Sequence, residues 1–118
     1  MRRSSSLSRS ALALAALLLL STSCLHDSEP AQLRGEIARH GAYFIVTECT
    51  TGKRYELDLI AQAYVALDRH VREVESALPA SPILVELGGK ILPPTGTTPA
   101  DGVFDVYERY DVRAGSCR

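Results

Sequence analysis

Three cysteines carry the clearest chemistry in this sequence, and they stand at Cys24, Cys49 and Cys117. A cysteine thiol can be acylated, can be oxidised to a disulfide, and can bind a soft metal ion. Cys24 follows an apolar segment near the amino terminus, whereas Cys49 and Cys117 lie far along the chain. These settings favour one role for Cys24 and a different role for the other two cysteines.

No other set of side chains has the spacing of a catalytic or metal-binding site. The three histidines are isolated in the sequence: His26, His40 and His70. No spacing places two of them with a cysteine as metal ligands. Serine, histidine and aspartate are present without a nucleophile motif. The sequence therefore predicts a protein that is not an enzyme and that has no cofactor and no native metal site.

The first 23 residues have the three regions of a secretion signal. Arg2, Arg3 and Arg9 lie among serines, and the apolar run Ala11–Leu20 follows them. As a helix this run covers roughly 15 Å, which is about half of a bilayer's hydrocarbon core and too short for a stable span. Residues 1–23 are therefore predicted to be a signal peptide that is removed from the mature protein.

Cys24 ends a segment that resembles the lipobox of bacterial lipoproteins, in which an aliphatic residue and two small residues precede an acylated cysteine. Leu20–Cys24 has the small residues and the cysteine, but Ser21 stands where leucine is usual. Cleavage by an ordinary signal peptidase is the alternative. An odd thiol is unusual in an exported protein. Lipidation of Cys24, with palmitate as one of the acyl groups, leaves an even number of cysteines and is favoured.

The lipid anchor predicts a location at the bacterial cell envelope. Leu25, rather than an acidic residue, follows Cys24. By resemblance to Gram-negative lipoprotein sorting, this implies the outer membrane, with the domain facing the periplasm. Two acyl chains bury enough methylene groups for stable anchoring. Secretion into the periplasm without a lipid is the alternative.

Behind the signal peptide the chain is acidic. Residues 1–23 hold three of the 13 Lys and Arg and no acid, so ten basic residues remain against 14 acidic ones, a formal charge of −4. This charge argues against nucleic acid as a partner, because its phosphate backbone requires a basic surface. Residues 24–32 are predicted to be a polar tether, and residues 33–118 are long enough for one small domain.

The domain contains five predicted strands and one predicted helix. The strands alternate apolar and polar side chains or are rich in β-branched and aromatic residues: Leu33–His40, Ala42–Cys49, Arg54–Leu59, Ile83–Leu92 and Val103–Val112. Apolar residues three and four apart from Tyr64 to Leu78 predict an amphipathic helix, which Pro79 ends. Gly52 suits a hairpin turn, and Gly88–Gly89 predicts a bulge or sharp bend in the fourth strand.

The order β-β-β-α-β-β is that of the OB-fold, a five-stranded Greek-key barrel with a helix between strands 3 and 4. We therefore predict a mainly β protein with a small OB-like barrel. A flat sheet with the helix on one face is the alternative. In the last strand Glu108 falls in register with the apolar side. It is expected either near the barrel mouth or at a bulge that turns it outward, because a buried acid without a partner is costly.

Cys49 ends the second predicted strand, and Cys117 follows the fifth. A disulfide between them would close a loop that the chain-entropy model values at roughly 4 kcal/mol, and an exported compartment permits it. A structural disulfide is favoured. A redox-responsive bond, a thiolate pair that binds a soft metal, and two free thiols remain open.

Five segments of the domain share features with one known family: Gly41–Phe44, Glu48–Tyr55, Pro82–Ile91, Val106–Tyr110 and Gly115–Cys117. They include a strand that leads into a cysteine, a Thr-Gly turn with a following aromatic residue, and a terminal cysteine. With these features the domain resembles the carboxyl-terminal OB-fold domain of NlpE-type copper-resistance and surface-sensing lipoproteins. The resemblance implies an OB barrel and a disulfide between Cys49 and Cys117. The family's amino-terminal Cys-x-x-Cys motif is missing, so no copper role carries over to any residue.

Tyr43 and Tyr107 are the candidate partner-binding residues. Tyr107 lies on the polar side of the last predicted strand, and Tyr43 is expected to share its face if the barrel pairs as an OB-fold does. We expect a non-enzymatic interaction module that contacts another envelope protein, with a link to envelope stress or the copper response. One alternative is a redox- or copper-responsive binder that uses Cys49 and Cys117, and another is a barrel that binds cell-wall glycan.

Overall fold

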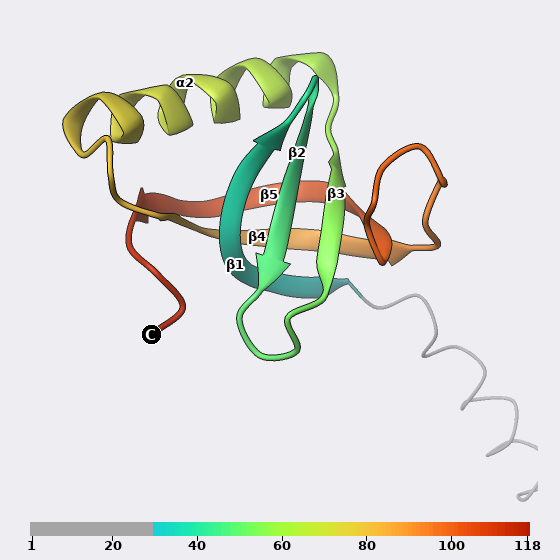
Figure 1. Ribbon diagram of the computed structural model, residues 1–118. Coiled ribbons are helices and arrows are strands. Elements are labelled where there is room, and N and C mark those ends of the chain that lie inside the picture. Colours follow the sequence, from blue (N-terminus) through green and yellow to red (C-terminus); the bar gives the residue numbers. More distant parts are fainter. Residues whose placement is uncertain (1–29) are drawn as a thin grey trace, which may run out of the picture.

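A computed structural model describes residues 30–118, in which five strands and one helix follow the order β-β-β-α-β-β (Figure 1). The bounds are β1 Ala31–His40, β2 Tyr43–Glu48, β3 Arg54–Asp58, α2 Ala61–Ala77, β4 Ile83–Leu92 and β5 Gly102–Ala114. The predicted signal peptide and the predicted lipidation site at Cys24 lie outside the described residues. Within residues 30–118, no helix is long and apolar enough to cross a membrane.

The five strands form a closed barrel in the order β1-β2-β3-β5-β4. All neighbouring strands run antiparallel except β3 and β5, which are parallel. The predicted element order and the closed barrel are therefore confirmed, and the flat-sheet alternative is wrong. The boundaries differ slightly, since β1 begins two residues earlier than predicted and β5 ends two residues later.

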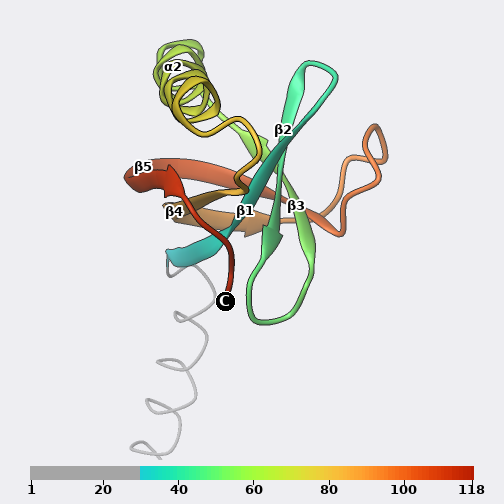
Figure 2. The same cartoon turned by 60° about the vertical axis from the view of Figure 1, so that its left-hand side comes forward.

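The barrel interior is filled by apolar side chains from every strand, and α2 covers one side of it, packed on β4 and β5. Figure 2 shows α2 nearly along its axis, above β4 and β5. From the helix, Leu67 and Val71 are buried in the core. Phe44 and Phe104 are the largest fully buried side chains. The predicted apolar stripe is thus a packing face as far as Val74, whereas Leu78 follows the end of the helix and is exposed.

Two glycines allow the backbones of neighbouring strands to approach closely. A Cβ atom on Gly35 would collide with the carbonyl oxygen of Thr47, and one on Gly89 would collide with that of Asp105. Gly89 also lies at a register shift, where Gly88 pairs with Glu108 but Gly89 pairs with Val106. An irregularity is therefore present at the predicted place, Gly88–Gly89, but the extra residue belongs to β5 and not to the fourth strand.

Two bulges interrupt the alternation of side chains along β5. The first register shift leaves Tyr107 without a partner on β4, and a second, between Glu86 and Leu87, does the same at position 110. Each extra residue turns the following side chains to the other face. Glu108 is therefore exposed, as the outward-turning bulge predicted, and does not lie in the apolar interior.

The amino-terminal end of α2 is held against the β1–β2 turn by Tyr64. The Tyr64 hydroxyl donates a hydrogen bond to the Ala42 carbonyl oxygen at 3.1 Å, and its ring lies 5.3 Å from the ring of Phe44. Arg39 of β1 reaches the helix from the same side and pairs with Asp68 and with Glu75. These contacts fix α2 relative to the barrel.

Asp68 gives this junction a pH dependence. A hydrogen bond from Arg72, then one from Arg39, holds the pKa of the Asp68 carboxyl below its usual 3.8. A lowered folded-state pKa adds stability that is present above the unfolded pKa and is lost as pH falls through the folded value. Asp68→Asn is therefore expected to lower the thermal unfolding midpoint modestly at neutral pH, with the difference shrinking to zero in strong acid.

The matched control is Glu73→Gln, which removes a carboxyl of the same helix that forms no ion pair within residues 30–118. Its unfolding midpoint should follow the parent at every pH. A constant Asp68→Asn difference between neutral pH and strong acid would contradict the assignment, because a structural effect of the amide does not titrate.

Candidate functional site

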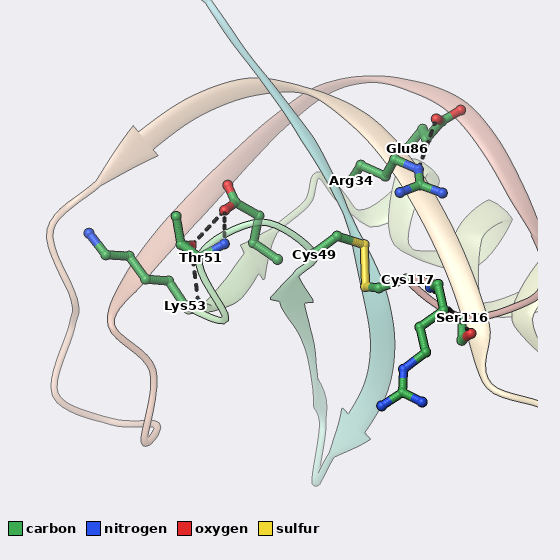
Figure 3. The surroundings of a disulfide bond; sticks show 9 residues. Arg34, Cys49, Thr51, Lys53, Glu86, Ser116 and Cys117 are labelled. Carbon is green, nitrogen blue, oxygen red and sulfur yellow. Dashed lines mark hydrogen bonds and ion pairs between the residues drawn. A yellow bond between two sulfur atoms is a disulfide. The ribbon is translucent and has the colours of Figure 1, made fainter.

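Cys49 and Cys117 form a disulfide that joins the end of β2 to the tail behind β5 (Figure 3). Their Cα atoms are 5.2 Å apart, and 68 positions separate them in the sequence. The amide of Cys49 donates to the carbonyl oxygen of Arg34 at 3.0 Å, so β1 holds this half of the bond. The amide of Gly115 donates to the carbonyl oxygen of Pro82 and directs the tail. The pairing implied by the family resemblance is thus present.

A tight turn positions Cys49 for the bond. The Glu48 carboxyl accepts hydrogen bonds from the amide of Thr51 at 3.0 Å and from its hydroxyl at 2.6 Å. The amide of Lys53 donates to that hydroxyl oxygen, and Gly52 has a φ of +72°. The predicted use of Gly52 in this turn is confirmed, because a left-handed residue is needed there.

A polar hollow of about 450 Å³ lies near the disulfide, between β1, β4 and the β2–β3 turn. Two of its charged lining residues, Arg34 and Glu86, form an ion pair at 3.6 Å, and Arg113 of β5 reaches the second oxygen of Glu86 at 3.8 Å. All three side chains are substantially exposed. Such pairs contribute little free energy. The third charged lining group, the Glu48 carboxyl, forms no ion pair within residues 30–118 and accepts hydrogen bonds from Thr51.

Tyr107 flanks an apolar hollow between the helix and the last strand, which we term the α2–β5 hollow. Its volume is about 230 Å³, and it is lined by Leu59, Ala63, Ala66, Leu67, Leu87, Val106, Tyr107 and Arg109. Tyr107 is 59% exposed, and Arg109 is exposed as well. The hollow therefore has an apolar floor with one aromatic and one cationic side chain at its edge.

Tyr43 lines a different hollow, which we term the β2–β3 hollow. Its volume is about 310 Å³, and it is lined by Tyr43, Glu56, Leu57, Asp58, Thr95, Thr97 and Val103. It lies between β3 and the β4–β5 loop, residues 93–101, which stands beside β3 in Figure 1 and Figure 2. Tyr43 and Tyr107 are both exposed, as predicted, but the structure does not bring them together in one hollow.

The remaining titratable candidates stay apart. His40, at the β1–β2 turn, and His70, on α2, are both exposed. Residues 30–118 contain no group of three or more His, Cys, Asp or Glu that could hold a metal ion.

Glu56 is the residue whose environment differs most from the sequence prediction. Strand alternation places it on the exposed side of β3, yet only 6% of it is accessible. The β4–β5 loop covers it, and the Thr95 hydroxyl lies 3.4 Å from one of its carboxyl oxygens. Its outward-facing neighbour on β2, Ile45, is buried as well. No feature of β3 itself signals this cover.

The sequence matches no known protein-family model and no curated protein. Among solved structures, the chain is similar in fold to the Cpx pathway activator NlpE from Escherichia coli, with a TM-score of 0.52 and 22% sequence identity. The similarity covers 75% of this chain and 43% of that one, so this chain spans less than half of NlpE. The predicted resemblance is thus supported by the structure, and the chain carries an OB-like barrel of the kind found in NlpE.

Proposed function

We propose that this protein is a non-enzymatic lipoprotein of the bacterial cell envelope whose barrel binds another envelope protein. The α2–β5 hollow is the binding site in this proposal. Its partner inserts an apolar side chain between α2 and β5 and presents a carboxylate to Arg109. A link to envelope stress is supported by the fold likeness to an activator of the Cpx pathway.

The observation that carries this proposal is the composition of the hollow's edge. Tyrosine and arginine are enriched among the residues that dominate binding energy at protein interfaces. Here Tyr107 and Arg109 stand exposed beside a largely apolar floor. The bulge at Tyr107 releases this side chain from the regular pleat of the barrel. Burial of the tyrosine ring adds contact area at small entropic cost, because it has few rotatable bonds.

The cellular setting follows from the amino-terminal sequence. In this proposal the signal peptide of residues 1–23 directs export and is removed, and acylation of Cys24 then attaches the domain to the outer membrane, with the barrel in the periplasm. The formal charge of −4 behind the signal disfavours nucleic acid and anionic lipid headgroups as partners. A secreted periplasmic form that lacks the lipid is the alternative.

The test is site-specific photo-crosslinking in cells of the source bacterium, with a photoreactive amino acid in place of Tyr107. We expect one discrete adduct in the membrane fraction. Arg109→Glu should reduce it several-fold, and Cys24→Ser should move the protein that has not been crosslinked to the soluble fraction. The same amino acid at Glu73, which is exposed on α2, is the control and should give no such adduct. Equal adducts at both positions, or an Arg109→Glu variant that crosslinks like the parent, would refute the α2–β5 hollow as the site.

A redox- or copper-responsive binder is the second candidate. Cys49 and Cys117 are only partly buried, so a small reductant has access to the bond between them. In this version the partner contact depends on the state of the bond. The Tyr107 adduct should then change when cells are treated with a thiol reductant or copper, whereas a purely structural disulfide predicts the same adduct for as long as the barrel stays folded.

A further inference from the structure

The β2–β3 hollow contains a buried carboxyl group that has no basic partner. Glu56 is 94% buried, with 6% of its surface accessible, and it lines the hollow. Its hydrogen bond from the Thr95 hydroxyl is long, at 3.4 Å. Across residues 30–118, no Lys, Arg or His lies within ion-pair distance of it. Burying a carboxylate is costly unless it is paired and hydrogen-bonded, so this group is available to a cationic ligand.

The other charged side chain that lines the hollow is also acidic. Asp58 lines the same hollow and is exposed, also without an ion pair in the described part of the chain. Asp105 of β5 pairs with Asp58 in the parallel register of β3 and β5. On its other side, Asp105 pairs with Lys90 of β4. Two carboxyl groups line the hollow and no basic side chain does. An anionic ligand such as a phosphate would be repelled.

The outer wall of the hollow is held in place before any ligand binds. Arg54, at the start of β3, anchors the end of the β4–β5 loop: its amide donates to the Asp101 carboxyl at 2.8 Å, and its carbonyl oxygen accepts from the Asp101 amide at 2.8 Å. Its guanidinium donates to the Pro99 carbonyl oxygen at 3.2 Å. The hydroxyls of Thr95 and Thr97 lie 2.7 Å apart. A wall fixed in this way loses little conformational entropy on binding.

We propose that the β2–β3 hollow binds the guanidinium group of an arginine side chain presented by a protein partner. A guanidinium has five donors in a planar fork that fits carboxyl groups, and it stacks on aromatic rings. Glu56 and Asp58 accept from it, and the half-exposed ring of Tyr43 at the edge of the hollow offers the stacking surface. A neutral sugar would leave the buried Glu56 carboxyl without a cation, which favours arginine over a glycan.

This inference names the chemistry of a protein partner at a second site, so it rests on the proposed function only in taking that partner to be a protein. The α2–β5 hollow shares no lining residue with the β2–β3 hollow. A small-molecule titration at Tyr43 therefore gives its answer independently of crosslinking at Tyr107.

The test is an NMR titration of the isotope-labelled full chain, in detergent, with N-acetyl-arginine amide. Its neutral counterpart, N-acetyl-citrulline amide, has nearly the same shape without the charge. The arginine probe is expected to shift the resonances of Tyr43, Thr95 and Thr97 along a saturating curve. The citrulline probe should leave them in place. Glu56→Gln removes the charge that accepts the guanidinium's hydrogen bond. Because hydrogen bonds to charged groups are the stronger ones, this variant should bind the arginine probe roughly tenfold more weakly or worse.

Three controls accompany the titration. Glu73→Gln, far from the hollow on α2, should bind the arginine probe as the parent does. Asp58→Asn, at an exposed position, should weaken binding even if Glu56→Gln perturbs the fold. Triacetylchitotriose, an uncharged oligosaccharide, should leave the three resonances unshifted. Equal shifts from citrulline, shifts from triacetylchitotriose that survive Glu56→Gln, or an absence of arginine shifts up to the solubility limit would each overturn the proposal.

Discussion

Replacement of both Cys49 and Cys117 by serine is expected to lower the free energy of unfolding by about 4 kcal/mol. The bond closes a loop across 68 positions, and its loss restores the chain entropy that this loop removes from the unfolded state. In a domain of this size, 4 kcal/mol corresponds to a fall of roughly 16 to 32 °C in the unfolding midpoint. Thermal or urea unfolding followed by circular dichroism measures both quantities.

Two comparisons make the disulfide result specific. Ser116→Ala, next to Cys117 but outside the bond, should unfold like the parent. The parent in excess reductant should unfold like the double serine variant, because both lack the crosslink. A double variant that unfolds within about 1 kcal/mol of the parent would mean that the reduced chain keeps the tail in place without the bond, contrary to the loop-entropy argument.

Gly89→Ala is expected to cost about 3 kcal/mol, the upper end of the usual range for overpacking. The new methyl group would meet the carbonyl oxygen of Asp105, an atom of the β5 backbone that has no rotamer to change. Relief therefore requires the bulged β4–β5 pairing to separate where the barrel closes. Urea unfolding of the variant, compared at a constant denaturant slope, measures the loss.

Gly52→Ala is the control, because it replaces a glycine by alanine at a position where the new methyl group meets no other atom. Gly52 has open space around its Cα and a φ of +72°, so alanine there bears only the left-handed backbone cost of about 1 to 2 kcal/mol. Gly35→Ala, which would meet the Thr47 carbonyl oxygen, should resemble Gly89→Ala. If Gly89→Ala proved no more destabilising than Gly52→Ala, the close approach of β4 and β5 would be refuted.

Local composition and periodicity were sufficient to predict the elements of the barrel, whereas its closure was predicted from their order and from the family resemblance. Strand alternation around Val46 and Leu57, and the apolar spacing along α2, each arise from neighbours that are close in sequence. The glycine pair Gly88–Gly89 also gave a local signal of the irregularity there, because a residue without a side chain lets the backbone of the neighbouring strand approach closely. The second bulge, between Glu86 and Leu87, has no glycine at that point, and the sequence did not predict it.

The candidate sites were predicted only in part, because they depend on contacts between distant segments. The exposure of Tyr43 and Tyr107 was predicted, although that of Tyr107 arises at a bulge and not from regular alternation. The burial of Glu56 results from a loop that meets it 39 positions later, through Thr95. The place of Arg109 beside an apolar hollow depends on where α2 lies. Neither contact changes the pattern of apolar and polar residues in the sequence around Glu56 or Arg109.

The position of the disulfide also determines how this domain responds to mechanical force. The bond joins Cys49 to Cys117 and so encloses β3, α2, β4 and β5 in one covalent ring. A pull applied between Ala31 and Arg118 can straighten only β1 and β2, residues 31–48, before the load passes through the sulfur–sulfur bond. At 3.3 to 3.6 Å per extended residue, that length is about 60 Å. Beyond this extension the oxidised domain acts as an inextensible link.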